Sequence, residues 1–277
     1  MTALTNLRLL LHLAWQALGL YGRHFLPLLL IGGLPTLLYH LFLLALGHSQ
    51  PPGPGLETSE ILTPALRIFS LWNLPNLLLL SPLVNGALVA AVRQLRHQES
   101  LQPLLALQDA LRAGQRLLGA TWFFWLPTGA AGGFAYWVWT HTQVSPGQML
   151  GGMMMIALVA GFLYYWWVRW AFLTQVVIEE GCGPAAAFTR SSRLVAGHWW
   201  LAFGLSTLLS TLPSLLDNLL DLAGPWAVMV GQSLVMPLST VGMTLLYREL
   251  RGSGEEGDWP DRALDGGQGS RYLGRGQ

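Results

Sequence analysis

The stretch MLGGMMMIALVAGFLYYWWVRWAFLTQVVI, residues 149–178, decides the fold class of this chain. Arg169 is the only charged residue in it. A helix needs about 20 apolar residues to cross the roughly 30 Å of hydrocarbon in a bilayer. The length and composition of this stretch are therefore typical of a membrane-spanning helix, and they predict an integral membrane protein.

Five more apolar runs lie on either side of this stretch, at residues 25–46, 68–92, 117–139, 199–222 and 225–247. Charged residues make up 10% of the chain, against about 25% in soluble globular proteins. We therefore predict an all-α fold, a polytopic transmembrane helical bundle of about six spans within residues 1–250. Because Asp217 and Asp221 shorten the fifth run, four spans with re-entrant segments are the alternative.

The two ends of the chain differ from this pattern. Residues 251–277 are rich in glycine and carry mixed charges, which predicts a disordered cytoplasmic tail. The leucine-rich N-terminus has some features of a signal peptide. We expect it to remain in the mature protein, because Arg23 and His24 interrupt it where a cleavage site would need small residues.

All 15 basic residues are arginines, and their distribution is uneven. The N-terminal segment, the connections after the second and fourth runs and the end of the sixth run carry Arg8, Arg23, Arg93, Arg96, Arg112, Arg116, Arg190, Arg193, Arg248 and Arg251. The other connections carry acidic residues or no charge, with Arg67 as the exception. The positive-inside rule therefore predicts a multi-pass protein of a bacterial plasma (inner) membrane with both termini cytoplasmic.

An amphipathic helix is predicted before each pair of runs. The clearest has Gln108, Asp109, Arg112, Gln115 and Arg116 on one face and Leu107, Leu111, Leu117 and Leu118 on the other. The first carries Thr5, Arg8, His12 and Gln16 at helical spacing, and the third carries Thr189, Arg190 and Arg193. We therefore predict three repeats, each an interfacial helix followed by a helical hairpin.

Arg169 is a candidate functional residue, because a charge near the bilayer centre costs about 2.5–3.5 kcal/mol on insertion scales. Pro82 and Pro237 each stand eleven residues before an arginine that ends a run. Arg169 stands eleven residues before Glu180, so it occupies the equivalent position in its own run. The predicted intramembrane polar site consists of Arg169, Asn85, Pro82 and Pro237, with the carbonyls of Leu78 and Ser233 as partners of the arginine. Alternatively, Arg169 snorkels to the headgroups and the prolines only shape packing.

The sequence contains no catalytic or metal-binding constellation that we recognise. Its seven histidines are isolated, and without lysine it cannot form a Walker motif. The single cysteine, Cys182, is expected to stay reduced on the cytoplasmic side. We therefore expect no cofactor, no metal and no enzymatic activity, and a net charge of +1 gives no indication of nucleic acid binding.

The segment after the fourth run combines glycine, proline, arginine and aromatic residues. It reads EEGCGP at 179–184, then Ala187, Arg190-Ser191, Leu194-Val195 and GHWW at 197–200. It resembles the signature of a bacterial family of six-span membrane proteins of uncharacterised function, similar to the membrane domain attached to some glycerophosphoryl diester phosphodiesterases. The sequence has no counterpart of the catalytic barrel of the fused members, so their activity is not carried over.

In this segment we predict a headgroup-facing motif made of Glu180, Gly183, Pro184, Arg190, Ser191, Arg193 and His198. Gly183 is expected to end one helix and Pro184 to begin the next. The partners implied are the anionic headgroups of membrane lipids at the inner leaflet, and other membrane proteins.

These features favour a non-enzymatic integral membrane protein, a scaffold or accessory protein in envelope or lipid-related processes. A small-solute transporter or channel that uses proline-kinked helices and Arg169 is the first alternative. A membrane-embedded enzyme that acts on lipids is the second.

Overall fold

The computed structural model describes residues 3–45, 74–96, 101–141 and 146–255, and within these ranges every regular element is helical. The elements are α1 (Ala3–Arg23), α2 (Phe25–Leu28), η1 (Leu29–Gly33), α3 (Leu34–Ala45), η3 (Asn76–Leu80), α5 (Ser81–Arg96), α6 (Pro103–Arg112), α7 (Gly114–His141), α8 (Pro146–Arg169), α9 (Leu173–Glu180), α10 (Pro184–Ala196), α11 (Trp199–Leu220), η4 (Asp221–Ala223) and α12 (Pro225–Glu255). The predicted all-α helical bundle is confirmed.

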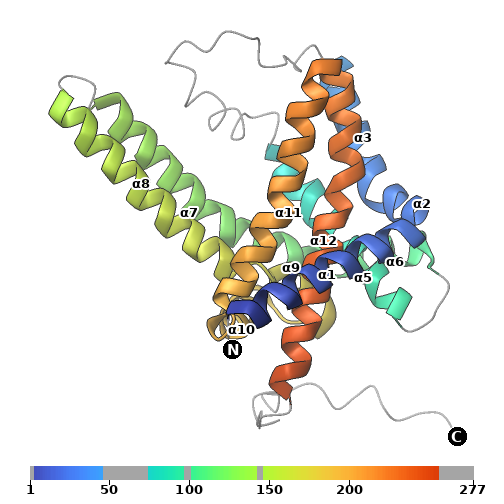
Figure 1. Cartoon of the computed structure of the whole chain (residues 1–277). Helices are drawn as coiled ribbons and strands as arrows, with labels where there is room; N and C mark the ends of the chain where they lie inside the picture. The colour runs from blue at the N-terminus through green and yellow to red at the C-terminus, as the bar shows by residue number, and fades with distance from the viewer. Residues whose placement is uncertain (1–2, 46–73, 97–100, 142–145, 256–277) are drawn as a thin grey trace, which may run out of the picture.

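Five segments of the described chain are long and apolar enough to cross a membrane: Phe25–Phe42, Asn76–Leu95, Gly147–Glu180, Trp199–Leu220 and Ala227–Gly252. The predicted run 117–139 is not among them, although α7 is a helix of 28 residues. Many of its residues are tryptophan and glycine, which contribute little hydropathy. Because α7 lies along α8 as the other half of a hairpin (Figure 1), it accompanies a membrane-spanning helix over its length.

The predicted fourth run forms a broken helix. α8 ends at Arg169, a turn follows at residues 170–172, and α9 then continues the run. At the break the backbone bonds become tighter, with the amides of Ala171 and Leu173 donating to carbonyls three residues earlier at 3.2 and 3.1 Å. The run at 149–178 therefore lies within one candidate membrane span, as predicted, but its helix is interrupted.

Two further boundaries concern the ends of the predicted segments. α12 continues to Glu255, so residues 251–255 are helical and do not belong to a disordered tail as predicted. The rest of that predicted tail, residues 256–277, lies outside the described residues. The start of the second run and the connection that contains Arg67 also lie outside them.

A short amphipathic helix precedes each pair of membrane helices, as predicted: α1 before α2, α6 before α7 and α10 before α11. α1 has three faces, a buried one of Leu13, Ala17 and Tyr21, an exposed apolar one of Leu11, Trp15 and Leu18, and an exposed polar one of Arg8, His12 and Gln16. Such a helix can contact the protein, the lipid and the aqueous phase at once, which suits the membrane interface.

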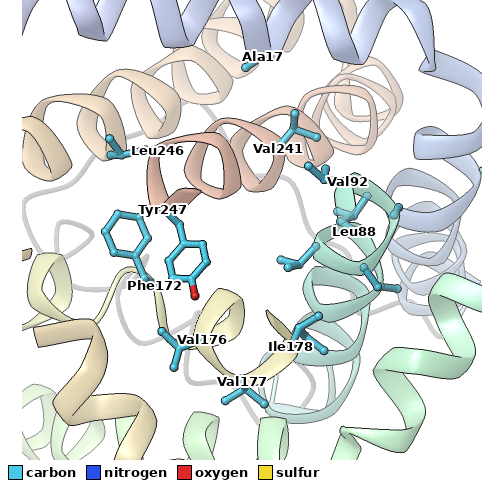
Figure 2. Close-up of a cluster of buried hydrophobic side chains, with 14 of the residues drawn as sticks. Ala17, Leu88, Val92, Phe172, Val176, Val177, Ile178, Val241, Leu246 and Tyr247 are labelled. Carbon is cyan, nitrogen blue, oxygen red and sulfur yellow. The ribbon is translucent and has the colours of Figure 1, made fainter. Parts of the chain in front are cut away.

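The core lies where the second helices of the three hairpins, α5, α9 and α12, meet (Figure 2). α5 packs against both α9 and α12, and Phe172 just before α9 contacts Tyr247 of α12 with ring centroids 5.9 Å apart. The buried side chains of this core include Leu88, Val92, Val176, Val177, Val241, Leu246 and Tyr247.

The interfacial helices close the three repeats into a ring. α6 packs against α5, and α10 packs against α9, so each of these contacts the last helix of the preceding repeat. α1, the interfacial helix of the first repeat, packs against α12, the last helix of the third repeat. The packing is therefore cyclic, with an approximate threefold character.

Candidate functional site

A cavity of about 680 Å³ lies between the hairpins, and all three hairpins contribute to its wall. Its polar lining residues include Thr36, His40, Ser81, Asn85, Thr121, Thr174, Gln175, Ser206, Ser210, Gln232, Ser239 and Thr240. Its aromatic lining residues are Phe124, Trp125, Trp167 and Trp170. The volume is within the range of about 300–1,000 Å³ found for small-molecule sites in proteins.

Asn85 links two of the helices at the cavity wall. Its amide oxygen accepts a hydrogen bond from the hydroxyl of Thr240 on α12 at 2.8 Å, and its amide nitrogen donates to Ser81 Oγ at 3.3 Å. Pro82, on the same helix, also lines the cavity. The structure thus places two of the predicted intramembrane site residues, Asn85 and Pro82, at one wall.

Four of the hydroxyl protons at the wall are already used. Those of Thr121, Ser206, Ser210 and Ser239 are donated to backbone carbonyls of their own helices at 2.8–3.1 Å. A hydroxyl that donates its proton still has lone pairs to accept with. These side chains therefore present hydrogen-bond acceptors to the cavity.

Two further acceptors at the wall are Gln175 and His40. Gln175 is 3% exposed, and its Oε1 is buried without a hydrogen-bond partner in the described structure. His40 Nδ1 lies 2.8 Å from the carbonyl of Thr36, and since a carbonyl only accepts, Nδ1 carries the proton of this bond. In the neutral ring this leaves Nε2 as an acceptor. Buried polar atoms are seldom unpaired, so Gln175 is a candidate for ligand contact.

Charge is absent from the described part of this wall, since no Asp, Glu, Lys or Arg is among the described lining residues. His40 is the one histidine among the described lining residues. The described wall therefore combines polar and apolar side chains without an Asp, Glu, Lys or Arg.

A charged cluster made of Arg93, Asp109, Glu179, Glu180, Arg190 and Arg248 lies next to this cavity, on α5, α6, α9, α10 and α12. Asn85 and Thr240 precede Arg93 and Arg248 by eight residues, about 12 Å along a helix. The cluster therefore closes the bundle at the end where the interfacial helices pack.

Arg248 joins all three second helices within the cluster. Its guanidinium forms an ion pair with Glu179 of α9, and the two side chains are 10% and 11% exposed. It also donates to the carbonyl of Val92 on α5 at 3.5 Å. A buried pair of this kind depends on both partners, since either charge alone would be uncompensated.

Glu180 is the second centre of the cluster. Its carboxylate accepts from Arg190 Nε on α10 at 3.1 Å and from the hydroxyl of Tyr247 on α12 at 2.7 Å.

Arg93 pairs with Asp109 of α6 at 2.6 Å and donates to the carbonyl of Ile178 at 3.3 Å. Arg93, Glu180 and Arg248 are equivalent in the predicted repeat register, and the fold brings the three together.

The end of α9 corrects the prediction for Gly183. Gly181 has a left-handed backbone with φ of 67° and ends α9, while Gly183 is extended and precedes Pro184, the first residue of α10. Glycine adopts the left-handed conformation without a Cβ clash, so Gly181 is the residue that stops the helix. Arg116 donates to the Gly181 carbonyl and fixes this turn. Pro184 begins its helix as predicted.

The predicted headgroup-facing motif is largely turned inward. Ser191 is fully buried, and Arg190 is mostly buried in its ion pair with Glu180, so the prediction that they meet the headgroups is wrong. The reason is that the Ser191 hydroxyl bonds to the backbone at the break at 170–172, and the Arg190 guanidinium pairs with the carboxylate of Glu180. Arg193 is exposed, and His198 is half-buried.

Arg169 and Pro237 are not at the cavity wall, so the structure does not assemble the four-residue site as predicted. The guanidinium of Arg169 lies over the rings of Tyr165 and Trp166, 5.8 and 5.6 Å from their centroids, and donates to the hydroxyl of Tyr165 at 3.3 Å. The expected partner carbonyl of Ser233 faces Gly33 instead. Tyr165 and Trp166 lie one turn earlier on α8, so the Arg169 side chain packs along its own helix, outside the cavity.

The chain was compared with protein-family models, with curated proteins and with solved structures. None matches it. The site therefore has to be interpreted from its own chemistry.

The most informative cavity residues, Gln175 and His40, were not predicted from the sequence. Both are single polar residues in apolar runs, and such a residue is more often exposed at a helix end or bonded to its own backbone. The available signal for Gln175 was a side chain with four hydrogen-bonding sites inside an apolar run, only five residues before Glu180. That signal does not distinguish a cavity from a packed interface.

Proposed function

We propose that this protein is a small-solute transporter or channel, whose binding site is the polar cavity between the three hairpins. The observation that carries the proposal is a cavity of about 680 Å³ whose wall includes many polar side chains, among described membrane segments whose exposed surfaces are dominated by apolar side chains. A polar cavity at membrane depth is costly unless it holds water or a solute.

The helix irregularities support the same proposal. The π-helix η3, the break at 170–172 and Pro213 inside α11 all contribute residues to the cavity wall. Non-helical or distorted backbone at membrane depth is tolerated where it lines a protein cavity, and discontinuous helices form the sites of many transporters. The charged cluster would then close the cavity toward the side of the interfacial helices.

A flux measurement on the full chain in liposomes tests the proposal. We expect faster solute entry than in empty liposomes, and we expect Thr174→Trp, which fills the cavity from α9, to abolish the increase. Leu158→Trp is the matched control, because Leu158 is 68% exposed on α8 and points away from packed protein. If no tested neutral or charged solute enters faster than in empty liposomes, the transport function is wrong.

We also propose that both termini and the interfacial helices are cytoplasmic and that six segments cross the membrane, with α7 as the third. The exposed arginines Arg8, Arg112 and Arg193 on α1, α6 and α10 support this orientation. Antiparallel pairing of α7 with α8 supports the even number of crossings, since five would put the termini on opposite sides.

Cys182 tests this orientation. We expect a membrane-impermeant maleimide to label it in inside-out vesicles and not in intact cells, with Cys182→Ser as the blank. Burial raises the pKa of the Cys182 thiol, so less thiolate is present at pH 7 and labelling should accelerate as the pH rises toward 9. Labelling from the outside of intact cells would overturn the orientation.

A scaffold or accessory role remains a prediction, as does the resemblance to the six-span family. Large exposed apolar side chains on α7 and α8, such as Phe123, Leu126 and Leu158, are compatible with contact to lipid or to another membrane protein. Stable co-purification of a partner in mild detergent would support that role in place of transport.

A further inference from the structure

We infer that the solute of the cavity is uncharged and rich in hydrogen-bond donors, a polyol or a related hydroxylated molecule, and that Gln175 is a residue that recognises it. This inference rests on the proposed transport function. It adds the chemical class of the solute and one specificity-determining residue.

The absence of charge from the described wall argues for a neutral solute. An ion moved from water into a cavity without a counter-charge loses much of its hydration, which costs several kcal/mol even after relaxation. The nearest charged cluster does not help, because Glu179 and Glu180 are already paired with Arg248 and Arg190. A neutral solute avoids this cost.

The direction of the hydrogen bonds argues for a solute that donates. The wall hydroxyls of Thr121, Ser206, Ser210 and Ser239 give their protons to backbone carbonyls, and Thr240 gives its proton to Asn85. These hydroxyls therefore offer a ligand their lone pairs, and Gln175 Oε1 is a further unpaired acceptor. A molecule with several O–H groups can satisfy these acceptors, whereas a molecule with acceptors alone cannot.

The aromatic residues at the wall complete the match to a hydroxylated carbon skeleton. Phe124, Trp125, Trp167 and Trp170 line the same cavity. Their flat apolar faces can cover the C–H surface of a polyol while the opposite walls accept its hydroxyl protons. These rings could also attract an organic cation, which the charge argument disfavours and the experiment below separates.

Gln175 is assigned the recognition role because its buried Oε1 has no partner in the described structure. An unpaired buried oxygen destabilises the empty protein, so a solute hydroxyl that reaches it recovers that cost. This gives Gln175 a functional signature that a structural residue would not have. Replacing it with methionine should reduce solute recognition and should not lower the stability of the fold.

The test uses the full chain in liposomes and stopped-flow light scattering. Polyols of increasing length (glycerol, erythritol, xylitol, sorbitol) are compared with potassium chloride and choline chloride at equal osmolarity. We expect entry of at least one polyol above that of empty liposomes and no increase for either salt. In Gln175→Met the polyol entry should fall about tenfold, as for one lost hydrogen bond, with an unchanged apparent melting temperature. Gln108→Met, at an exposed position on α6, is the matched control and should keep full entry.

Each other outcome has a distinct meaning. Entry of potassium or choline without polyol entry would overturn the neutral-solute inference and leave the transport function standing. Polyol entry that is unchanged in Gln175→Met would overturn the role of Gln175. No entry of any solute would overturn the transport function itself, and this inference with it.

Discussion

Ser191 holds a broken membrane helix together with one hydroxyl. At residues 170–172 the regular bonds shift, which leaves the carbonyl of Arg169 and the amide of Phe172 without their usual helical partners. Ser191 Oγ donates to the Arg169 carbonyl at 2.9 Å and accepts from the Phe172 amide at 3.3 Å. The Ser191 side chain is fully buried, so water is not available to replace its hydroxyl.

Replacing Ser191 with alanine should therefore destabilise the fold by about 1–3 kcal/mol, the cost of leaving buried polar groups unpaired. Thermal unfolding in detergent, followed by circular dichroism, measures the effect. Ser192→Ala is the control at the next position, where the hydroxyl is not buried against the break. Equal melting temperatures for the two variants would contradict the bridging role.

At the scale of the element, α12 and η1 cross closely because small residues meet a proline. The ring of Pro237 lies against Gly32, where an added Cβ would be 2.8 Å from Pro237 Cγ. Proline has no amide hydrogen, so the carbonyl of Ser233 loses its helical partner. That carbonyl faces Gly33, where an added Cβ would lie 2.5 Å from the oxygen. The π-helix η1 and α12 therefore pack directly against each other at the proline of α12.

Gly33→Ala should separate η1 from α12 and destabilise the protein by about 1–3 kcal/mol, as in other overpacked interiors. The obstacle is a backbone oxygen, which cannot rotate away as a side chain would. Gly161→Ala on α8 is the control, because an added Cβ there meets nothing within 4 Å and alanine favours the helix. A lowered melting temperature for Gly33→Ala alone is the expected result, and the reverse order would disprove the close crossing.

At the scale of the whole molecule, three repeats close into a ring through contacts between residues far apart in the chain. Arg248 of α12 bonds to α5 and α9, and Tyr247 bonds to Glu180. The junctions between repeats also have polar links: Arg93 with Asp109, Glu180 with Arg190, and the hydroxyl of Tyr21 with the carbonyl of Leu234. The ring sets the position of the cavity, because all three hairpins converge on the charged cluster below it.

Arg248→Gln should destabilise the bundle by about 3–5 kcal/mol, because Glu179 would remain buried without its partner. The same substitution at Arg112, whose side chain is 70% exposed, should cost less than about 1 kcal/mol. Unfolding in detergent compares the two variants. Similar losses for both would show that the cluster does not hold the three helices together.

The contact that closes the ring can be captured by a disulfide between α1 and α12. An added Cβ at Gly242 would lie 3.6 Å from the Cβ of Ala17, which is within the spacing of a disulfide. We expect Ala17→Cys with Gly242→Cys, in a Cys182→Ser background, to cross-link under mild oxidation, as seen by mass spectrometry.

Gly22→Cys with Gly242→Cys should not cross-link, since an added Cβ at Gly22 meets nothing within 4 Å. Cross-linking of this control pair alone would place a different face of α1 against α12.

The helices themselves follow from the sequence, because helix formation in a membrane depends on local composition. A long apolar run must satisfy its backbone bonds internally, so the run at 149–178 predicts a helix at membrane depth whatever its neighbours are. The amphipathic helices follow for a similar reason, since their periodicity sets one face of α6 or α10 toward the bundle. The register of Arg93, Glu180 and Arg248 is likewise readable in the chain.

Only the tertiary structure determines which polar groups meet. The sequence predicts that Ser191 and Arg190 contact lipid headgroups. In the structure both point inward, because Ser191 bonds to the backbone at the 170–172 break and Arg190 bonds to Glu180. Arg169 stands out in the sequence but lies among aromatic rings away from the cavity, whereas Gln175, which draws no attention in the sequence, is at its wall. The periodicity of the sequence determines which residues share a face of a helix. The free energy of pairing between helices determines which residues that face contacts.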